Sequence, residues 1–91
     1  MKFDKDTGWF FRAWIYDRII TYDTLVKARV GAMQYIEDSG MNHNSSVTIF
    51  NHENRYKPIG EVCYDGSKRW LYHSMTTHRW YDMRSDGRIK H

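Results

Sequence analysis

Apolar and polar residues alternate with a helical period in one segment of the chain, residues 23–40. At about 100° per residue, the apolar positions fall on one side of a helix, and they are Leu25, Ala28, Ala32, Tyr35 and Ile36. Asp23 or Thr24 can cap the amino end, because a side-chain oxygen there can accept a free backbone N–H. Gly40 suits the left-handed position that follows many helices. The pattern therefore predicts a helix over about residues 24–39.

Two residues interrupt the apolar side of this helix. Arg29 lies within the apolar arc, so we expect its side chain either to reach solvent or to meet a carboxylate. Gly31 stands in the helix interior, where glycine costs about 1 kcal/mol relative to alanine. It is either tolerated there or required by the close approach of a neighbouring strand or a partner.

The segment before the helix has the composition of β-structure. Residues 9–16 are rich in aromatic side chains, and the odd positions form one apolar face. The even positions form an aromatic face with one charge: Phe10, Arg12, Trp14 and Tyr16. Two apolar faces predict a central strand or one covered on both sides. Ile19–Tyr22 either continues this strand past a bulge or returns as a hairpin arm after a turn at Asp17-Arg18, and we favour the hairpin.

Four further strands are predicted after the helix, at Ser46–Asn51, Ile59–Tyr64, Arg69–Ser74 and Arg79–Met83. The longest predicted loop, Asn51–Pro58, separates the first two. Asp65-Gly66 is the strongest turn signal, and the strand after it should pair back antiparallel. Further turns are predicted at Met75–His78 and Asp86-Gly87, which leaves Arg88–His91 as a tail or a short terminal strand.

The predicted fold class is α+β, with residues 1–91 forming a single domain. Short turns between consecutive strands favour antiparallel pairing, and one helix can cover only one face of a sheet. We therefore expect a four- to five-stranded antiparallel sheet with the helix on one face, in the order β(β)-α-β-β-β-β. The sequence leaves open which side chains face the helix, because a register slip of one residue exchanges the two faces.

Composition also predicts the cellular compartment of the protein. The 91 residues are 41% hydrophobic and 16% aromatic, which is enough for one core. A single cysteine excludes an internal disulfide, and the amino-terminal residues contain no apolar signal segment. No apolar run reaches the length of a membrane-spanning helix. We expect a cytoplasmic protein without membrane contact.

The positive charge is concentrated in the second half of the chain. Residues 1–54 hold six Lys/Arg and seven Asp/Glu, whereas residues 55–91 hold eight and four. The formal net charge of the whole chain is +3. This asymmetry favours an anionic partner.

Catalytic and metal-binding chemistry has weak support in the residue pattern. His73 and His78 are five residues apart, and Cys63 could approach them, but no further ligand has the spacing of a zinc site. Cys63 stands mid-strand like a small buried apolar residue rather than an activated nucleophile. No phosphate-binding loop or nucleophile elbow is present. We expect no enzymatic activity, no metal and no cofactor.

Interleaved rings and cations near the carboxyl end form the best candidate site. Strand alternation could place them on one open sheet face, where they would contact a protein or stack on bases and neutralise phosphates. The same pattern also fits a core with a charged rim. The candidate binding residues are Arg69, Trp70, Tyr72, Arg79, Trp80 and Arg84.

The segment Thr24–Gly40 leading into Ser46–Phe50, followed by strands ending in Trp80-Tyr81 and the turn and terminal residues Asp86–Ile89, resembles small accessory proteins of bacteriophages and mobile elements. Anti-CRISPR and other anti-defence inhibitors are among them. The resemblance implies a stoichiometric inhibitor or regulator that occupies a surface of host machinery, and it assigns no individual residue. DNA mimicry is disfavoured because the chain is basic.

The first expectation is therefore a small binding module whose partner is a protein or a protein–nucleic acid complex. Direct nucleic-acid binding is the second. A self-associating structural protein, such as a homodimer paired through sheet edges, is the third.

Overall fold

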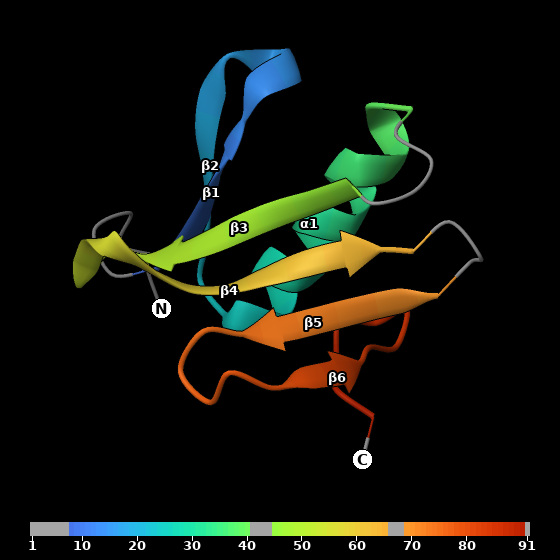
Figure 1. Ribbon diagram of the computed structural model, residues 1–91. Coiled ribbons are helices and arrows are strands. Elements are labelled where there is room, and N and C mark those ends of the chain that lie inside the picture. The colour runs from blue at the N-terminus through green and yellow to red at the C-terminus, as the bar shows by residue number, and fades with distance from the viewer. Residues whose placement is uncertain (1–7, 41–44, 66–68, 91) are drawn as a thin grey trace.

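The computed structural model describes residues 8–40, 45–65 and 69–90, without the side chains of residues 15, 45 and 54–56 (Figure 1). In chain order the elements are β1 (Trp9–Ala13), a short 3-10 helix η1 (Trp14–Tyr16), β2 (Arg18–Tyr22), α1 (Leu25–Asp38), β3 (Ser45–Asn51), β4 (Asn54–Tyr64), β5 (Trp70–Ser74) and β6 (Trp80–Asp82). The α+β class is confirmed. The described residues form six strands, so the predicted count of four to five is wrong.

All six strands belong to one antiparallel sheet with the order β2-β1-β3-β4-β5-β6. Both β2 and β3 run antiparallel to β1, so they are parallel to each other, and α1 connects them across one face of the sheet. Figure 1 shows α1 behind the strands and no described segment in front of them. The prediction that the helix packs on one face is confirmed.

The predicted ends of the helix agree with the structure. The Thr24 hydroxyl accepts a hydrogen bond from the Lys27 backbone N–H at 3.1 Å, which satisfies one of the free amides of the first turn. At the other end, Gly40 has a φ of +71°, and its N–H donates to the Glu37 carbonyl at 3.2 Å.

The two interruptions of the apolar side each have a structural reason. A Cβ on Gly31 would overlap the phenol ring of Tyr22, so glycine is required by the close approach of β2. Arg29 meets no carboxylate among the described residues. Its guanidinium lies 4.2 Å from the centre of the Tyr72 ring, and its Nη1 donates to the Gly87 carbonyl at 3.4 Å.

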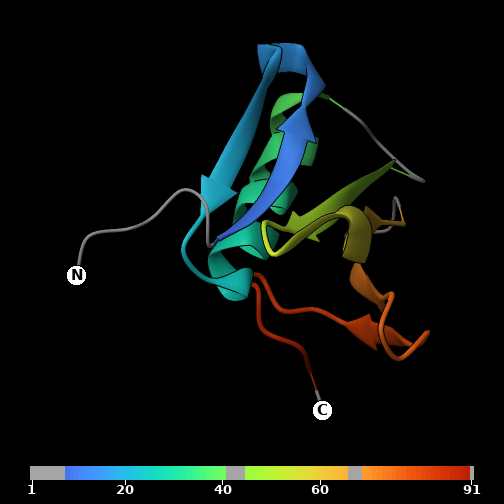
Figure 2. The same ribbon diagram turned by 90° about the vertical axis from the view of Figure 1, so that its left-hand side faces the viewer.

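The amino-terminal hairpin is confirmed, but its turn differs from the prediction. Strand β1 ends at Ala13, and η1 makes the reversal. Asp17 then adopts a left-handed conformation with φ 51°, and its N–H donates to the Trp14 carbonyl at 3.1 Å. The hairpin tip stands at the same end of the molecule as the carboxyl end of α1 (Figures 1 and 2), where the Tyr16 hydroxyl donates to Asp38 at 3.0 Å.

The predicted long loop Asn51–Pro58 is wrong. Strand β4 begins at Asn54, and a tight turn at His52 and Glu53 joins it to β3, with the Asn51 side chain accepting the Glu53 N–H at 2.8 Å. The register shifts next to Pro58, which pairs with Phe50. Proline has no N–H to give to the ladder, so an irregularity at this position lets the strand continue past it.

The later turns are largely as predicted. Strands β4 and β5 pair from Tyr64↔Trp70 onward, and the Asp65 N–H donates to the Arg69 carbonyl at 3.2 Å. The rest of the predicted Asp65-Gly66 turn, residues 66–68, lies outside the described residues. The turn at residues 75–78 is confirmed, with the His78 N–H donating to the Ser74 carbonyl at 2.8 Å.

The core lies between α1 and the sheet. Its largest fully buried side chains are Phe11, Ile36, Ile49 and Val62. The register places Val47 opposite Val62, and Val62 opposite Tyr72, so these positions share the face that α1 covers. The register therefore decides which side chains of the sheet face the helix, a choice that the sequence left open.

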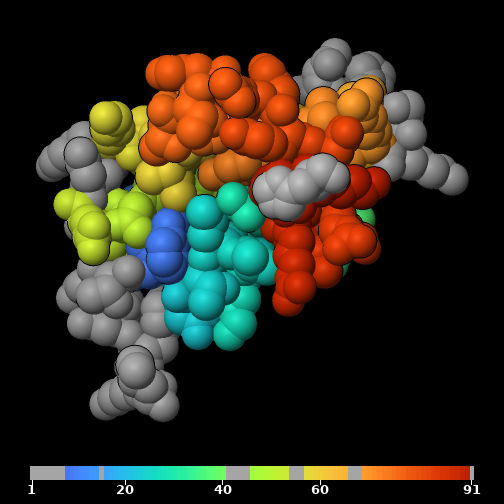
Figure 3. All heavy atoms as spheres, turned by 90° about the horizontal axis from the view of Figure 1, so that it is seen from below, coloured from blue at the N-terminus to red at the C-terminus, as the bar shows by residue number. Residues whose placement is uncertain are grey.

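After β6 the chain turns back against the helix. Gly87 has a φ of +86°, and a Cβ there would crowd the Val26 carbonyl and the Val30 side chain of α1. Ile89 forms a short antiparallel bridge with Met83, so part of the predicted tail pairs as a terminal strand would. Figure 3 shows this carboxyl-terminal segment lying against the amino-terminal half of α1. Among the described residues, no helix is both long and apolar enough to cross a membrane.

Candidate functional site

The structure divides the predicted binding residues between the two faces of the sheet. Tyr72 pairs with Tyr81 on the covered face, whereas the adjacent pair His73↔Trp80 points to the other side. Tyr72 is only 4% exposed and belongs to the core cluster. The expectation of one open face that carries all these rings is therefore wrong, because alternation along β5 and β6 separates them.

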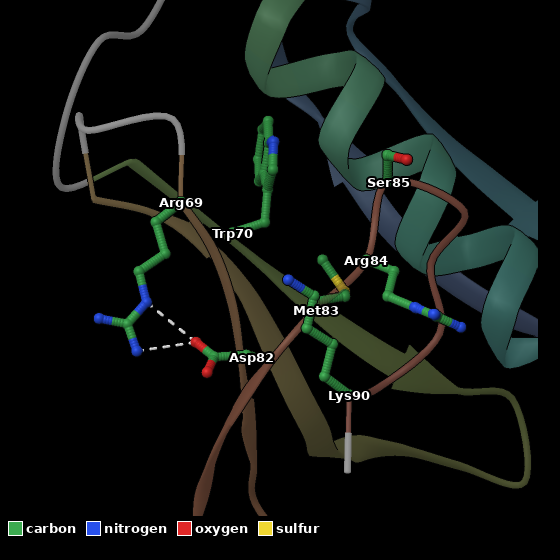
Figure 4. Close-up of a pocket in the computed structure, with 7 residues that line it drawn as sticks. All are labelled: Arg69, Trp70, Asp82, Met83, Arg84, Ser85 and Lys90. Carbon is green, nitrogen blue, oxygen red and sulfur yellow. Dashed lines mark hydrogen bonds and ion pairs between the residues drawn. The ribbon is translucent and has the colours of Figure 1, made fainter.

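The cations of the predicted site also point in different directions. Arg69 is exposed and pairs with Asp82, its Nη2 lying 2.8 Å from a carboxylate oxygen. Figure 4 shows Arg84 extending the opposite way, while Trp70 points toward the side on which α1 lies. Trp70 is half-buried, with its ring centre 4.8 Å from that of Tyr64. Arg79 is exposed in the turn before β6.

The face of the sheet opposite α1 is the more open of the two. We call it the uncovered face, and its register positions include Phe10, Arg12, Thr48, Phe50, Glu61, Cys63, Leu71, His73, Trp80 and Asp82. An aromatic cluster lies where β1 meets the end of β3: the ring centres of Phe10 and Phe50 are 5.5 Å apart, and that of His52 lies 4.4 Å from that of Phe10. This packing leaves Phe10 only 8% exposed although no described segment crosses the face.

Two tryptophans stand out from this face. Trp14, at the start of η1, is 73% exposed, and the Arg12 guanidinium lies 4.8 Å from its ring centre. Trp80 is 55% exposed and stacks on His73 at 4.5 Å with nearly parallel planes. Each tryptophan is therefore held by a neighbouring side chain while most of its surface stays open.

A shallow hollow lies beside each tryptophan. Strands β1 and β3 pair at Trp9 and Phe10 and then diverge, and the space between them has a volume of about 310 Å³ lined by Arg12, Trp14 and Thr48, among others. The hollow beside Trp80 is about 250 Å³, and Cys63 and Leu71 contribute to its wall. The surface of the uncovered face is therefore hollowed beside Trp14 and beside Trp80.

The charged groups of the uncovered face are mostly paired. Arg12 forms an ion pair with Asp17 at 2.6 Å, and Arg69 is paired with Asp82. The Nδ1 of His73 lies 3.4 Å from a Glu61 carboxylate oxygen, a contact that is an ion pair only when the imidazole carries a second proton. This face therefore offers rings and nearly balanced charge rather than a positive field.

The structure also bears on two further hypotheses, that Cys63 is a nucleophile and that histidine and cysteine side chains bind a metal. Burial, followed by the charge of Glu61, raises the pKa of Cys63 to about 12, so its thiol keeps its proton at neutral pH. Across residues 8–40, 45–65 and 69–90, no group of three or more His, Cys, Asp or Glu side chains is gathered as metal ligands would be.

Sequence reasoning missed Trp14 as an exposed residue, although a signal for it was present. The even positions of residues 9–16 form an aromatic face with one charge, and the structure places Phe10 and Arg12 of that set on the uncovered face. What the pattern could not show is that β1 ends at Ala13, which turns Trp14 outward.

No family model, no curated protein and no solved structure matches the chain. The assignment of function therefore depends on the geometry described above.

Proposed function

We propose that this protein is a small non-enzymatic binding module that docks a protein partner on its uncovered face. The observation that carries the proposal is the pair of exposed tryptophans, Trp14 and Trp80, on a face whose neighbouring charges are mostly paired. Tryptophan is enriched among the residues that contribute most to protein–protein affinity. Aromatic residues and arginine are enriched at such interfaces relative to the rest of the surface.

The size of the face suits a specific interface. Trp14 follows β1 and Trp80 lies in β6, and four strand spacings separate these strands in the sheet order. Strands β1 and β3 diverge after Phe10, so regular strand spacing gives only a lower bound for the separation of Trp14 from β6. A standard-size interface buries about 800 Å² on each partner, and each tryptophan with its adjoining hollow provides one anchor point for a contact of this kind.

The proposed class of partner rests on the sequence resemblance rather than on the geometry of the uncovered face. Small phage and mobile-element proteins of the anti-defence type often act by occupying a surface of a larger host complex, and an aromatic face with hollows suits such an occupant. We accordingly propose a component of host machinery, either a protein or a nucleoprotein, as the partner.

The test is affinity capture from host lysate with the tagged full-length chain and its variants. Trp14→Ala and Trp80→Ala should each lose a protein that the parent chain retains, because each removes a large exposed ring. Val30→Ala is the matched control, since Val30 is an exposed apolar side chain on α1, away from the uncovered face. Retention of every captured protein by both tryptophan variants would remove the uncovered face from consideration.

Nucleic-acid binding is a second candidate, and three of the residues that the sequence suggested for it line one hollow: Arg69, Trp70 and Arg84. Arg69, Arg84 and Lys90 line an open hollow of about 710 Å³ at the carboxyl-terminal edge of the sheet (Figure 4). Nuclease treatment of the lysate separates the two candidates: a partner held by protein contact survives it, and one bridged by nucleic acid does not. A strong salt dependence of capture would also favour nucleic acid.

Self-association is the third candidate. Strand β2 is an edge of the sheet and carries Ile19, whose side chain is 50% exposed. Edge strands can pair between copies. Light scattering at several concentrations tests this, since a pairing edge would give a mass that rises with concentration.

A further inference from the structure

A separate pocket lies on the other side of the molecule, where α1, the β5–β6 pair and the carboxyl-terminal segment meet. We call it the arginine pocket, and its principal walls are Arg29, Tyr72, Tyr81, Arg84, Arg88 and Ile89. It is an open hollow with a volume of about 610 Å³. Figure 3 shows the two segments that supply its arginines, the amino-terminal half of α1 and the carboxyl-terminal segment, lying against each other.

Arg29 is the innermost cation of the pocket. Its guanidinium is held over the Tyr72 ring at 4.2 Å, which fixes the plane of the group. Its Nη1 has one long hydrogen bond, 3.4 Å, to the Gly87 carbonyl. Its Nε is buried and has no hydrogen-bond partner among the described residues. The rest of the guanidinium lines the pocket without a described carboxylate paired to it, so its charge would attract an anion there.

Arg84 and Arg88 add two more positive charges from the carboxyl-terminal segment. Arg84 forms no ion pair with another described residue, and Arg88 has only a long contact of 3.9 Å with Asp86. Among the described residues, none with a carboxylate side chain lines the pocket. Three guanidinium groups around one cavity favour an oxyanion with several acceptor oxygens, and phosphate fits the bidentate geometry of arginine.

The remaining walls are apolar or aromatic. Val26 and Ile89 contribute aliphatic surface, and Tyr81 is half-buried at the margin. Inorganic phosphate would leave this surface in water. A ligand with a phosphate at one end and a ring at the other would use both the cations and the apolar walls.

We propose that the arginine pocket binds a small organic phosphate of the nucleoside monophosphate class. The site is independent of the uncovered face, so its occupancy and the capture of a protein partner can be tested separately. The phosphate would lie between Arg29 and the two arginines of the carboxyl-terminal segment, and the ring would lie against Val26, Tyr81 and Ile89.

The test is titration calorimetry of the full-length chain with adenosine monophosphate, and in parallel with inorganic phosphate and with adenosine. We expect saturable one-to-one binding of the monophosphate and at least about tenfold weaker binding of each fragment. Arg84→Gln and Arg88→Gln should each weaken the monophosphate about tenfold, because a charge-assisted hydrogen bond contributes about one order of magnitude in affinity. Both residues are exposed, so neither change should alter the circular dichroism of the fold.

Two further variants sharpen the test. Arg18→Gln removes the same charge from an exposed residue on β2, outside the pocket lining, and should leave the affinity unchanged. Arg29→Lys keeps the charge but loses the planar group that lies on Tyr72, and it should weaken binding. The proposal is overturned if the monophosphate does not bind at millimolar concentration, if inorganic phosphate binds as tightly, or if Arg18→Gln weakens binding as much as Arg84→Gln.

Discussion

The two faces of the sheet use the same kinds of side chain for different purposes. On the covered face, the ring centre of Phe11 lies 5.8 Å from that of Tyr22 and 5.7 Å from that of Tyr35, and α1 packs on this cluster. On the uncovered face, Trp14 and Trp80 rest on single neighbours and keep most of their surface open. Aromatic content alone therefore distinguishes neither a core nor a binding surface, and the position of the helix makes the difference.

The cations show the same division. Those of the uncovered face are held in ion pairs or lie beside a carboxylate, as with Arg12 and Asp17. Arg29, on the helix side, rests on Tyr72 and forms no ion pair with a described residue, whereas a buried Nε without a hydrogen-bond partner among the described residues is common to Arg12 and Arg29. A paired cation contributes little outward field, whereas an unpaired one in a pocket attracts an anion. The comparison therefore supports the two proposals, protein contact on one side and anion binding on the other.

The largest expected effect comes from exchanging one ring on each face for alanine. Phe11 is fully buried, so Phe11→Ala should lower the free energy of unfolding by about 3–5 kcal/mol through lost burial and the cavity left behind. Trp80→Ala should lower it by less than about 1 kcal/mol, because a largely exposed side chain contributes little to stability. Urea denaturation followed by circular dichroism measures both. Equal losses would show that the uncovered face is part of the core.

The next effect concerns Cys63, which lies on the uncovered face but is half-buried. Burial raises the pKa of its thiol from the ordinary 9.0 to about 12, so alkylation by iodoacetamide at pH 8 should be on the order of a thousandfold slower than in the chain unfolded by denaturant. Since the native pKa is the higher one, the stabilisation is complete below about pH 9 and is lost as the pH rises toward 12. Cys63→Ala should reduce that alkaline loss. Equal alkylation rates in the two states would contradict the burial.

The smallest effect tests how closely the covered face is packed. Gly31→Ala should destabilise the protein by about 1–3 kcal/mol, because the new Cβ would overlap the Tyr22 ring, even though alanine has the better helix propensity. Glu37→Ala, at an exposed position of α1, is the matched control and should change stability by no more than about 0.5 kcal/mol. Thermal unfolding of both variants gives the comparison, and a gain in stability from Gly31→Ala would mean that β2 does not approach the helix this closely.

The sequence by itself determined the helix, most of the strands and the α+β class. These features depend on local chemistry: the spacing of apolar residues from Leu25 to Ile36, the cap at Thr24, the left-handed Gly40 and the turn signals between strands. Each is fixed within a few residues along the chain, so a linear pattern is enough to predict it.

The tertiary structure decided which face each ring occupies and which cations meet. Tyr72 lies in the core and Trp80 on the surface because the pairing of β5 with β6 decides which face of the sheet each side chain occupies. The residues next to Tyr72 and Trp80 in the sequence do not determine that face. Arg29 and Arg88 line the same pocket, and Arg29 donates to the carbonyl of Gly87, which is 58 positions away along the chain. Contacts over such separations arise from the packing of whole elements, and so the candidate sites were decided only by the folded chain.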